Sequence, residues 1–206
     1  MNYIDLTRII AHGMPVYPGD MPVELVSLMD VETHAVSNHA LKCSMHIGTH
    51  IDAPGHMLVD GKKLTDFPVS SFIGKGKLVD ARGKGVITKD LLTNVSLEKG
   101  DVVIILTGFD EHFYEKNYYS EYPAIDAGFA QALIAAGINM VGMDTPSPDY
   151  APFAIHKALM EHDILIIENL TNVSALLGQK AFEIIALPIK VETDGALARV
   201  IAKMVR

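Results

Sequence analysis

The sequence predicts a mixed α/β fold in a single domain that covers residues 1–206, and three observations lead to this prediction. The first half of the chain reads as strands separated by turns, whereas the second half alternates helices with short apolar strands. A strand, a helix and a further strand at this spacing favour a parallel pair with a right-handed crossover. With 206 residues, 49% of them hydrophobic, the chain can bury a core without a second domain.

The first half is expected to contain three strands, at residues 3–6, 23–31 and 40–47. A turn-rich segment that contains Pro18 and Gly19 separates the first two strands. The single cysteine, Cys43, cannot form an internal disulfide. Because it would lie on the opposite face of the third strand from His46, we expect it to pack in the core.

In the second half, Asp126 is the predicted N-cap and Gly137 the predicted C-terminal stop of a helix at residues 127–136. The next expected elements are a strand, a helix and three strands, at residues 138–143, 153–161, 164–168, 183–191 and 196–204. The whole series therefore predicts a sheet that mixes parallel and antiparallel strands.

Strand ends in this half of the chain carry carboxylates. Sites in open α/β sheets form just beyond the carboxyl ends of strands, and Asp144 and Glu168 each end an apolar strand in that way. Glu168 is therefore a candidate metal ligand, and His156, in the helix between them, could reach the same edge. Taken singly, a histidine on a helix and a glutamate at a strand end are more often plain surface residues.

The densest chemical signal is the segment His46-Ile-Gly-Thr-His50-Ile-Asp52-Ala-Pro-Gly-His56, which holds three of the nine histidines and a carboxylate. Imidazole nitrogen and carboxylate oxygen are the ligands that a divalent ion such as Zn²⁺ takes when no thiolate is offered. Three protein ligands leave a position open for water. The segment therefore predicts a metal site.

A straight strand could not form that site. His46 and His50 would stand roughly 13 Å apart at about 3.3 Å per residue, too far for two ligands of one ion. The chain must therefore curl, with Gly48 as the expected bend and Pro54 preventing a helix from continuing. Thr49 is expected to hold the loop through its hydroxyl group.

Charge and hydropathy exclude several classes of protein. The formal net charge is −8 and no run of Lys or Arg occurs, so neither a nucleic acid nor an anionic membrane surface is an expected partner. The N-terminal segment carries Asp5 and Arg8 where a signal peptide would need an apolar stretch, and no apolar run is long enough to span a bilayer. We therefore expect a cytoplasmic protein.

Several further segments fall in the same order as in a known family. These are Tyr17-Pro-Gly-Asp20, the histidine-rich segment of residues 46–56, Gly142-Met-Asp144-Thr-Pro-Ser147-Pro-Asp149, His156, Glu168-Asn-Leu170 and Gly195-Ala-Leu-Ala-Arg199. Together they resemble the cyclase family of metal-dependent hydrolases, which includes bacterial kynurenine formamidases. The resemblance runs through nearly the whole chain, and its histidine-rich segment is highly specific.

The resemblance implies a role for each candidate. His46, His50 and Asp52 would bind one metal and His156 a second, with Asp52 and Glu168 bridging the two. It also implies a swivelling β/β/α fold and a homodimer. Two Zn²⁺ ions per chain are expected, although this ligand set also suits Mn²⁺ or Co²⁺.

The expected chemistry is hydrolysis of an amide by a metal-activated water. A divalent ion can lower the pKa of its water to about 7 and polarise a carbonyl group. The amine that leaves must be protonated, and His56 is the expected general acid and base because a free histidine titrates near neutral pH. If His56 instead binds the ion, Asp52 or an ordered water would have to carry the proton. By the resemblance, the reaction is hydrolysis of N-formylkynurenine to kynurenine and formate, a step of tryptophan catabolism.

Tyr17 leaves other substrates open, since kynurenine formamidases typically carry Trp before Pro-Gly-Asp and this chain has no tryptophan. Tyr keeps the aromatic face of a substrate-binding residue but changes its shape and adds a hydroxyl group. The alternatives are opening of a cyclic amide such as isatin, hydrolysis of another amide or ester, and metal binding without turnover.

Residues 109–122 contain six of the fourteen aromatic residues. As a long loop, this segment could close over a flat aromatic amide. Packing under the loop, or a dimer contact, is an equally good interpretation.

Overall fold

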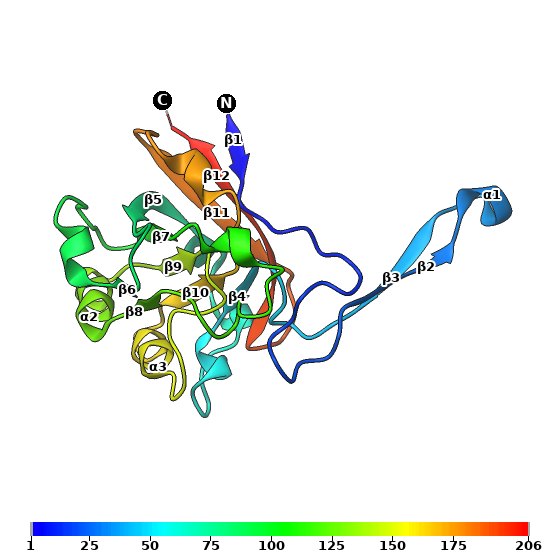
Figure 1. The fold of residues 1–206 in the computed structure, drawn as a ribbon, viewed down its shortest axis with the longest axis horizontal. Helices are drawn as coiled ribbons and strands as arrows, with labels where there is room; N and C mark the ends of the chain where they lie inside the picture. Colours follow the sequence, from blue (N-terminus) through cyan, green and yellow to red (C-terminus); the bar gives the residue numbers. More distant parts are fainter. Residues whose placement is uncertain (1, 206) are drawn as a thin grey trace.

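An eight-stranded mixed sheet forms the body of the protein in the computed structural model, which describes residues 2–205 (Figure 1). Across the sheet the strands are β1 (Tyr3–Asp5), β12 (Gly195–Met204), β11 (Phe182–Pro188), β5 (Ile73–Asp80), β7 (Val102–Leu106), β9 (Met140–Met143), β10 (Leu165–Glu168) and β4 (His50–Asp52). The strands β5, β7, β9 and β10 are parallel, and the other pairs are antiparallel. The predicted mixed α/β class is confirmed.

The short strand β4 closes this sheet on itself, because it pairs with β10 on one side and with β12 on the other. One apolar cluster fills the inside of the resulting barrel-like arrangement and takes residues such as Ile51, Ile104, Ile167 and Ile184 from strands around it. The sequence had not predicted β4 as a strand.

Two helices, α2 (Ala127–Ala136) and α3 (Ala154–Met160), cover the outer face of the parallel strands. Alternate residues of β7 separate the two cores: Ile104 lies in the barrel cluster, whereas Val103 and Ile105 pack with Phe129 and Leu133 of α2. A small parallel pair, β6 (Val86–Ile87) and β8 (Ala124–Ile125), lies beside α2 (Figure 1).

The helix α2 has the predicted limits for the predicted reasons. The side chain of Asp126 accepts a hydrogen bond from the Phe129 N–H at 2.7 Å, which satisfies a free donor of the first turn. Gly137 ends the helix in the left-handed region, at φ 66°. The helix α3 starts one residue later than predicted, at Ala154, and ends at Met160.

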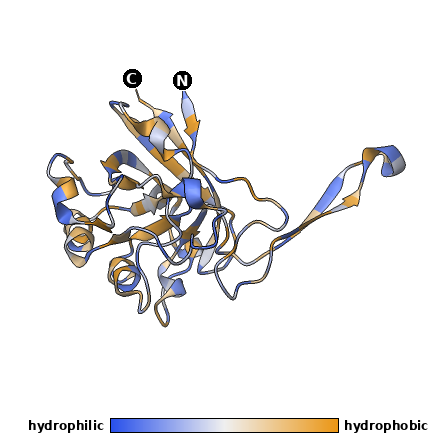
Figure 2. Ribbon diagram, in the orientation of Figure 1, coloured by the Kyte–Doolittle hydropathy of each residue, from blue (hydrophilic) through white to orange (hydrophobic). Residues whose placement is uncertain are grey.

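A hairpin arm projects from the body and consists of β2 (Glu24–Met29), the short helix α1 (Val31–His34) and β3 (Asn38–Lys42) (Figure 1). Figure 2 shows apolar residues along this arm. The exposed large apolar side chains of the arm are Val26, Leu28, Met29, Val31, Val36 and Leu41.

One predicted strand needs correction, and two strands were missed. The strand expected at residues 40–47 ends at Lys42, so Cys43 lies beyond it, where it packs half-buried against the cluster of Met14 and Ile47. The chain leaves the arm there and bends toward the site. Strands β5 and β7 were not predicted, because β5 contains two glycines and β7 is a short, continuously apolar run. Among the described helices, none combines the length and apolar character required to cross a membrane.

Candidate metal centre

The site lies on the outer face of the barrel, where β4 pairs with β10. The antiparallel register places Glu168 opposite His50 and Ile166 opposite Asp52. Because side chains alternate along a strand, His50, Asp52 and Glu168 all leave the sheet on the outer face, while Ile51 and Ile167 enter the barrel core. The pairing therefore gathers three buried polar side chains beside α3.

His50 shows that this cluster fits a cation. Its Nδ1 bonds the carbonyl oxygen of Gly48 at 2.9 Å and must therefore carry the proton. The other nitrogen, Nε2, is buried and has no hydrogen-bond partner among the described residues, yet it lies 3.3 Å from Asp52 Oδ1 and 3.4 Å from Glu168 Oε2. Once it has lost its proton, this nitrogen forms, with the two carboxylate oxygens, a set of electron-pair donors that a divalent cation would satisfy.

The bend at Gly48 brings His46 back over the site. Gly48 has φ 51°, and a Cβ there would lie 2.7 Å from Ile10, so both conformation and space favour glycine. Thr49 is buried and donates its hydroxyl hydrogen to the Asn169 carbonyl oxygen at 2.7 Å, which holds the loop as expected. His46 Nδ1 then lies 2.7 Å from Asp52 Oδ1.

Asp52 belongs to two groups of potential ligands. The donor atoms of His46, Asp52 and His56 lie within 4.8 Å of one another, and so do those of His50, Asp52 and Glu168. The rings of His46 and His56 are stacked with their centroids 4.0 Å apart. The ring of His46 also meets the ring of His50 edge to face, with centroids 5.3 Å apart, so His46 and Asp52 lie beside both other histidines.

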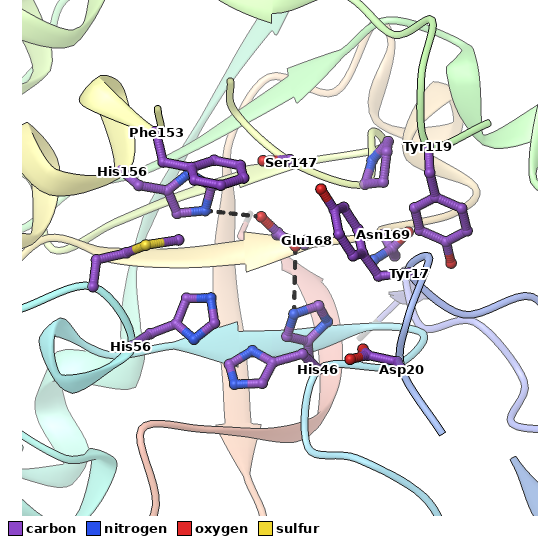
Figure 3. A pocket seen from close by; sticks show the side chains of 13 residues that line it. Tyr17, Asp20, His46, His56, Tyr119, Ser147, Phe153, His156, Glu168 and Asn169 are labelled. Carbon is purple, nitrogen blue, oxygen red and sulfur yellow. Dashed lines mark ion pairs between the residues drawn. The ribbon is translucent and has the colours of Figure 1, made fainter. Parts of the chain in front are cut away.

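His156 reaches the same site from α3. Its Nε2 lies 3.2 Å from Glu168 Oε1, while the other carboxylate oxygen of Glu168 faces His50 (Figure 3). Its Nδ1 bonds Asp149 Oδ1 at 2.6 Å, and Asp149 also accepts the Ile155 N–H at the start of α3. Glu168 therefore presents one oxygen to each histidine, as a bridging carboxylate would.

The buried histidines hold protons tightly when no cation is present. Burial would lower the pKa of His156, but Asp149 and Glu168 outweigh it and raise the pKa to about 10. Burial would also lower the pKa of His46, but Asp52 and Asp194 outweigh it and raise the pKa to about 9. A cation that binds these nitrogens must displace protons, so its affinity falls as the pH is lowered.

The opposite shift occurs at Asp52. Burial alone would raise the pKa of this carboxyl group, but the adjacent His50 and His46 hold the pKa well below its usual range. Asp52 is therefore ionised at neutral pH, as a metal ligand must be.

A cavity of about 320 Å³ opens onto these residues. Figure 3 shows Tyr17, Tyr119 and Phe153 around it, with His56 and His156 on the side of the candidate metal ligands. The rings of Tyr17 and Tyr119 meet edge to face, with centroids 5.7 Å apart. The cavity thus combines aromatic walls with a polar base.

Most of the aromatic segment 109–122 packs in the core instead of forming a lid. Phe113 and Tyr118 are fully buried, and Tyr118 donates its hydroxyl hydrogen to Asn169 Oδ1 at 2.9 Å. Of the six aromatic residues of the segment, only Tyr119 lines the cavity. The packing interpretation therefore holds for the segment, and the interpretation as a closing loop does not.

The sequence brought together His46, His50, Asp52, His56, His156 and Glu168, and the structure places all six within one cluster. Their individual roles stay predictions. Asp144 lies apart: it accepts hydrogen bonds from the Thr107 and Gly108 N–H groups and from the Thr107 hydroxyl, and it joins two strand ends without lining the cavity.

Sequence reasoning missed two acidic residues that orient the histidines. Asp149 was quoted only as part of a motif, and its position seven residues before His156 was the available signal. Asp194 gave no signal, because its partners His46 and His56 lie more than a hundred residues away in the sequence.

Comparisons with known proteins agree with this geometry. Residues 4–150 match the model of a family described as putative cyclase. A kynurenine formamidase from Bacillus cereus is 31% identical over 98% of this chain and 97% of its own. Among solved structures, a potential metal-dependent hydrolase with cyclase activity has a TM-score of 0.84, is 27% identical and covers 100% of this chain and 98% of its own. Isatin hydrolase A from Ralstonia solanacearum has a TM-score of 0.87, covers 98% of this chain and 91% of its own, and at 20% identity shows the shared fold alone.

Proposed function

The chain belongs to the cyclase family, and from this premise we propose that it is a metal-dependent amidohydrolase that converts N-formylkynurenine to kynurenine and formate. The observation that carries the proposal is the buried Nε2 of His50, which faces two carboxylates and has no hydrogen-bond partner among the described residues. Burial would lower the pKa of His50, but Asp52 and Glu168 raise it, so this place favours a positive charge, which a proton or a divalent cation supplies.

His46, His50, Asp52, His156 and Glu168 would hold the metal. When bound, a divalent cation supplies a Lewis acid for the substrate carbonyl group and lowers the pKa of water. Two ions fit best, because Asp52 and Glu168 each face histidines on two sides. Zn²⁺ is the first choice for nitrogen and oxygen ligands, with Mn²⁺ and Co²⁺ as alternatives.

The chain itself supplies the proton transfer. His56 lines the cavity beside the candidate metal ligands, and its ring is stacked on His46. It would take a proton from the attacking water and deliver a proton to the amide nitrogen as the bond between carbon and nitrogen breaks. The aniline nitrogen of the product then leaves neutral, and formate carries the oxygen from water.

The cavity walls support an aromatic substrate. Tyr17, Tyr119 and Phe153 offer ring faces and edges, and Met57 adds a flexible apolar contact. A flat ring held there would turn its formyl group toward His56 and the metal cluster. Tyr17 in place of Trp favours a second candidate, isatin, whose fused ring has a different outline.

A substrate comparison tests the proposal. The protein is stripped of metal, reloaded separately with Zn²⁺, Mn²⁺ or Co²⁺, and assayed with N-formylkynurenine and isatin. Preference for N-formylkynurenine is expected, and preference for isatin would move the chain to the cyclic-amide alternative. Tight metal binding without turnover of these or other amides and esters would instead indicate a metal-binding protein.

We also propose that the enzyme is a homodimer whose contact involves the hairpin arm. Both strands of the arm are almost wholly exposed, although the arm carries several large apolar side chains. A two-stranded hairpin alone is marginally stable in water, and exposed apolar patches commonly mark protein contacts. A second copy of the chain would cover this surface symmetrically.

A further inference from the structure

Asp194, directly before β12, places one carboxylate oxygen between two histidines of the candidate site. Its Oδ2 lies 3.1 Å from His56 Nδ1 and 3.1 Å from His46 Nε2. We propose that Asp194 is a positioning residue that fixes the ring orientation and the tautomer of His56 for proton transfer. This inference rests on the proposed function, in which His56 moves the proton.

The backbone around Asp194 is fixed to the site. Its carbonyl oxygen accepts the Ala53 N–H at 2.7 Å, and the next residue, Gly195, is paired with Asp52 across β12 and β4. A Cβ at Gly195 would lie 2.4 Å from the His46 ring, so glycine lets the strand approach that ring closely. The strand that positions Asp52 therefore also sets the place of the Asp194 carboxylate.

An ionised carboxylate accepts hydrogen bonds but has no hydrogen to donate. The contact with Asp194 therefore places the proton of neutral His56 on Nδ1 and leaves Nε2 with a free electron pair. An acidic residue that holds one nitrogen of a catalytic histidine in this way sets both the tautomer and the orientation of the ring.

The effect of Asp194 should fall mainly on His56, because His46 has other support. His46 also contacts Asp52 at 2.7 Å and packs against Gly195. Among the described residues, Asp194 is the single hydrogen-bond partner shown for the His56 side chain. Without it, the ring would keep its stacking on His46 but could rotate or change tautomer.

Kinetics of the metal-loaded protein with N-formylkynurenine test this role. Asp194→Asn should lower kcat on the order of 100-fold, leave KM within about threefold, and leave the metal content unchanged. In a His56→Ala background the same substitution should change kcat less than about threefold, since it acts through His56. Glu192→Gln is the matched control: it removes a nearby exposed carboxylate, paired with Lys63, and should not change kcat.

An NMR measurement makes the test independent of turnover. With ¹⁵N-labelled histidine in zinc-loaded protein at mildly alkaline pH, His56 is identified by its absence in His56→Ala and should show the Nδ1–H tautomer, which Asp194→Asn should remove. The Nε2–H tautomer in the wild type, or equal costs of Asp194→Asn with and without His56, would overturn the proposal. If the wild type ignores N-formylkynurenine, the proposed substrate is wrong, and the tautomer still decides the role of Asp194.

Discussion

His50 and His56 lie six residues apart in the sequence but meet the site in different ways. His50 is fully buried between Asp52 and Glu168, whereas His56 is half-buried and bonded to Asp194. This difference supports the proposed roles of His50 as a metal ligand and of His56 as the proton carrier. At the scale of single residues, the two side chains should therefore respond differently to removal.

His50→Ala is expected to lose metal, because among the described residues it is the histidine whose Nε2 lies within 3.4 Å of both Asp52 and Glu168. His56→Ala should keep its metal and its fold while kcat falls by about 10²- to 10⁴-fold, the usual contribution of a general acid and base. Elemental analysis and steady-state kinetics of both variants provide the measurement. Equal loss of metal from the two variants would make His56 a ligand, as its distance from His46 and Asp52 also permits.

Tyr17→Trp tests the substrate pocket. Tyr17 is 42% exposed and meets Tyr119 edge to face, so a larger ring has room to extend into the cavity mouth. The substitution should raise kcat/KM for N-formylkynurenine relative to isatin by several-fold, about 1 kcal/mol, through added aromatic contact. Unchanged kinetics for both substrates would show that Tyr17 does not contact them.

Asp144, which lies outside the group of candidate metal ligands, should make the stability of the fold depend on pH. Burial raises the pKa of this carboxyl group to about 6, although its hydrogen bonds to Thr107 and Gly108 oppose the shift. Since the pKa in the folded state lies above 3.8, the ordinary value for an aspartate, the folded state binds this proton more tightly. Stability from Asp144 is therefore full below about pH 4 and is lost as the pH rises through about 6.

Chemical denaturation of metal-free protein, wild type against Asp144→Asn, checks this dependence. When the pH is lowered from about 7 to about 4, the unfolding free energy of the wild type should increase relative to that of Asp144→Asn by up to about 3 kcal/mol. Both proteins share the other titrating groups, so their effects cancel. A difference that does not vary with pH would contradict the raised pKa.

The hairpin arm is the feature that stands out at the scale of elements. The arm contributes no residue to the three apolar clusters of the body and exposes Leu28 of β2 and Val31 of α1 to solvent. By contrast, α2 and α3 bury one face each against the sheet. These exposed apolar side chains support the proposed contact of the arm with a second copy of the chain.

Leu28→Asp is therefore expected to weaken the proposed dimer, because it places a charge in the apolar contact. Light scattering coupled to gel filtration should show a dimer for the wild type and monomer for the variant at low micromolar concentration. Val86→Asp, an exposed apolar position on the body, is the control and should remain dimeric. A dimer that persists in Leu28→Asp would exclude Leu28 of the arm as an essential contact.

At the scale of the whole molecule, the cores and the metal site are separate. Of the three apolar clusters, one fills the barrel, one lies under the helices and one gathers around Met14 and Ile47. The site lies on the outer face, between β4, β10 and α3. The fold should therefore persist without metal, unlike that of a zinc finger.

Removal of metal by a chelator should abolish turnover and leave the far-ultraviolet circular dichroism unchanged, with a lower Tm because the metal binds only the folded state. Restoring Zn²⁺ should restore both activity and Tm. Loss of secondary structure on chelation would show that the cluster of His50, Asp52 and Glu168 is needed for folding.

The sequence by itself determined the features that depend on neighbouring residues. The limits of α2 follow from Asp126 and Gly137, and the bend before His50 follows from Gly48. The prediction of a metal site followed from the types and spacing of the residues between His46 and His56. Such patterns involve residues that are close in the sequence, where the residue types directly favour a local backbone geometry.

Only the tertiary structure decided how distant residues meet. The double pairing of β4 closes the sheet and sets Glu168 beside His50, and the start of β12 brings Asp194 to His56. The same packing buries Tyr118 and leaves Tyr119 at the cavity. Register between strands more than a hundred residues apart arises from burial of the whole sheet, so no local pattern carries it.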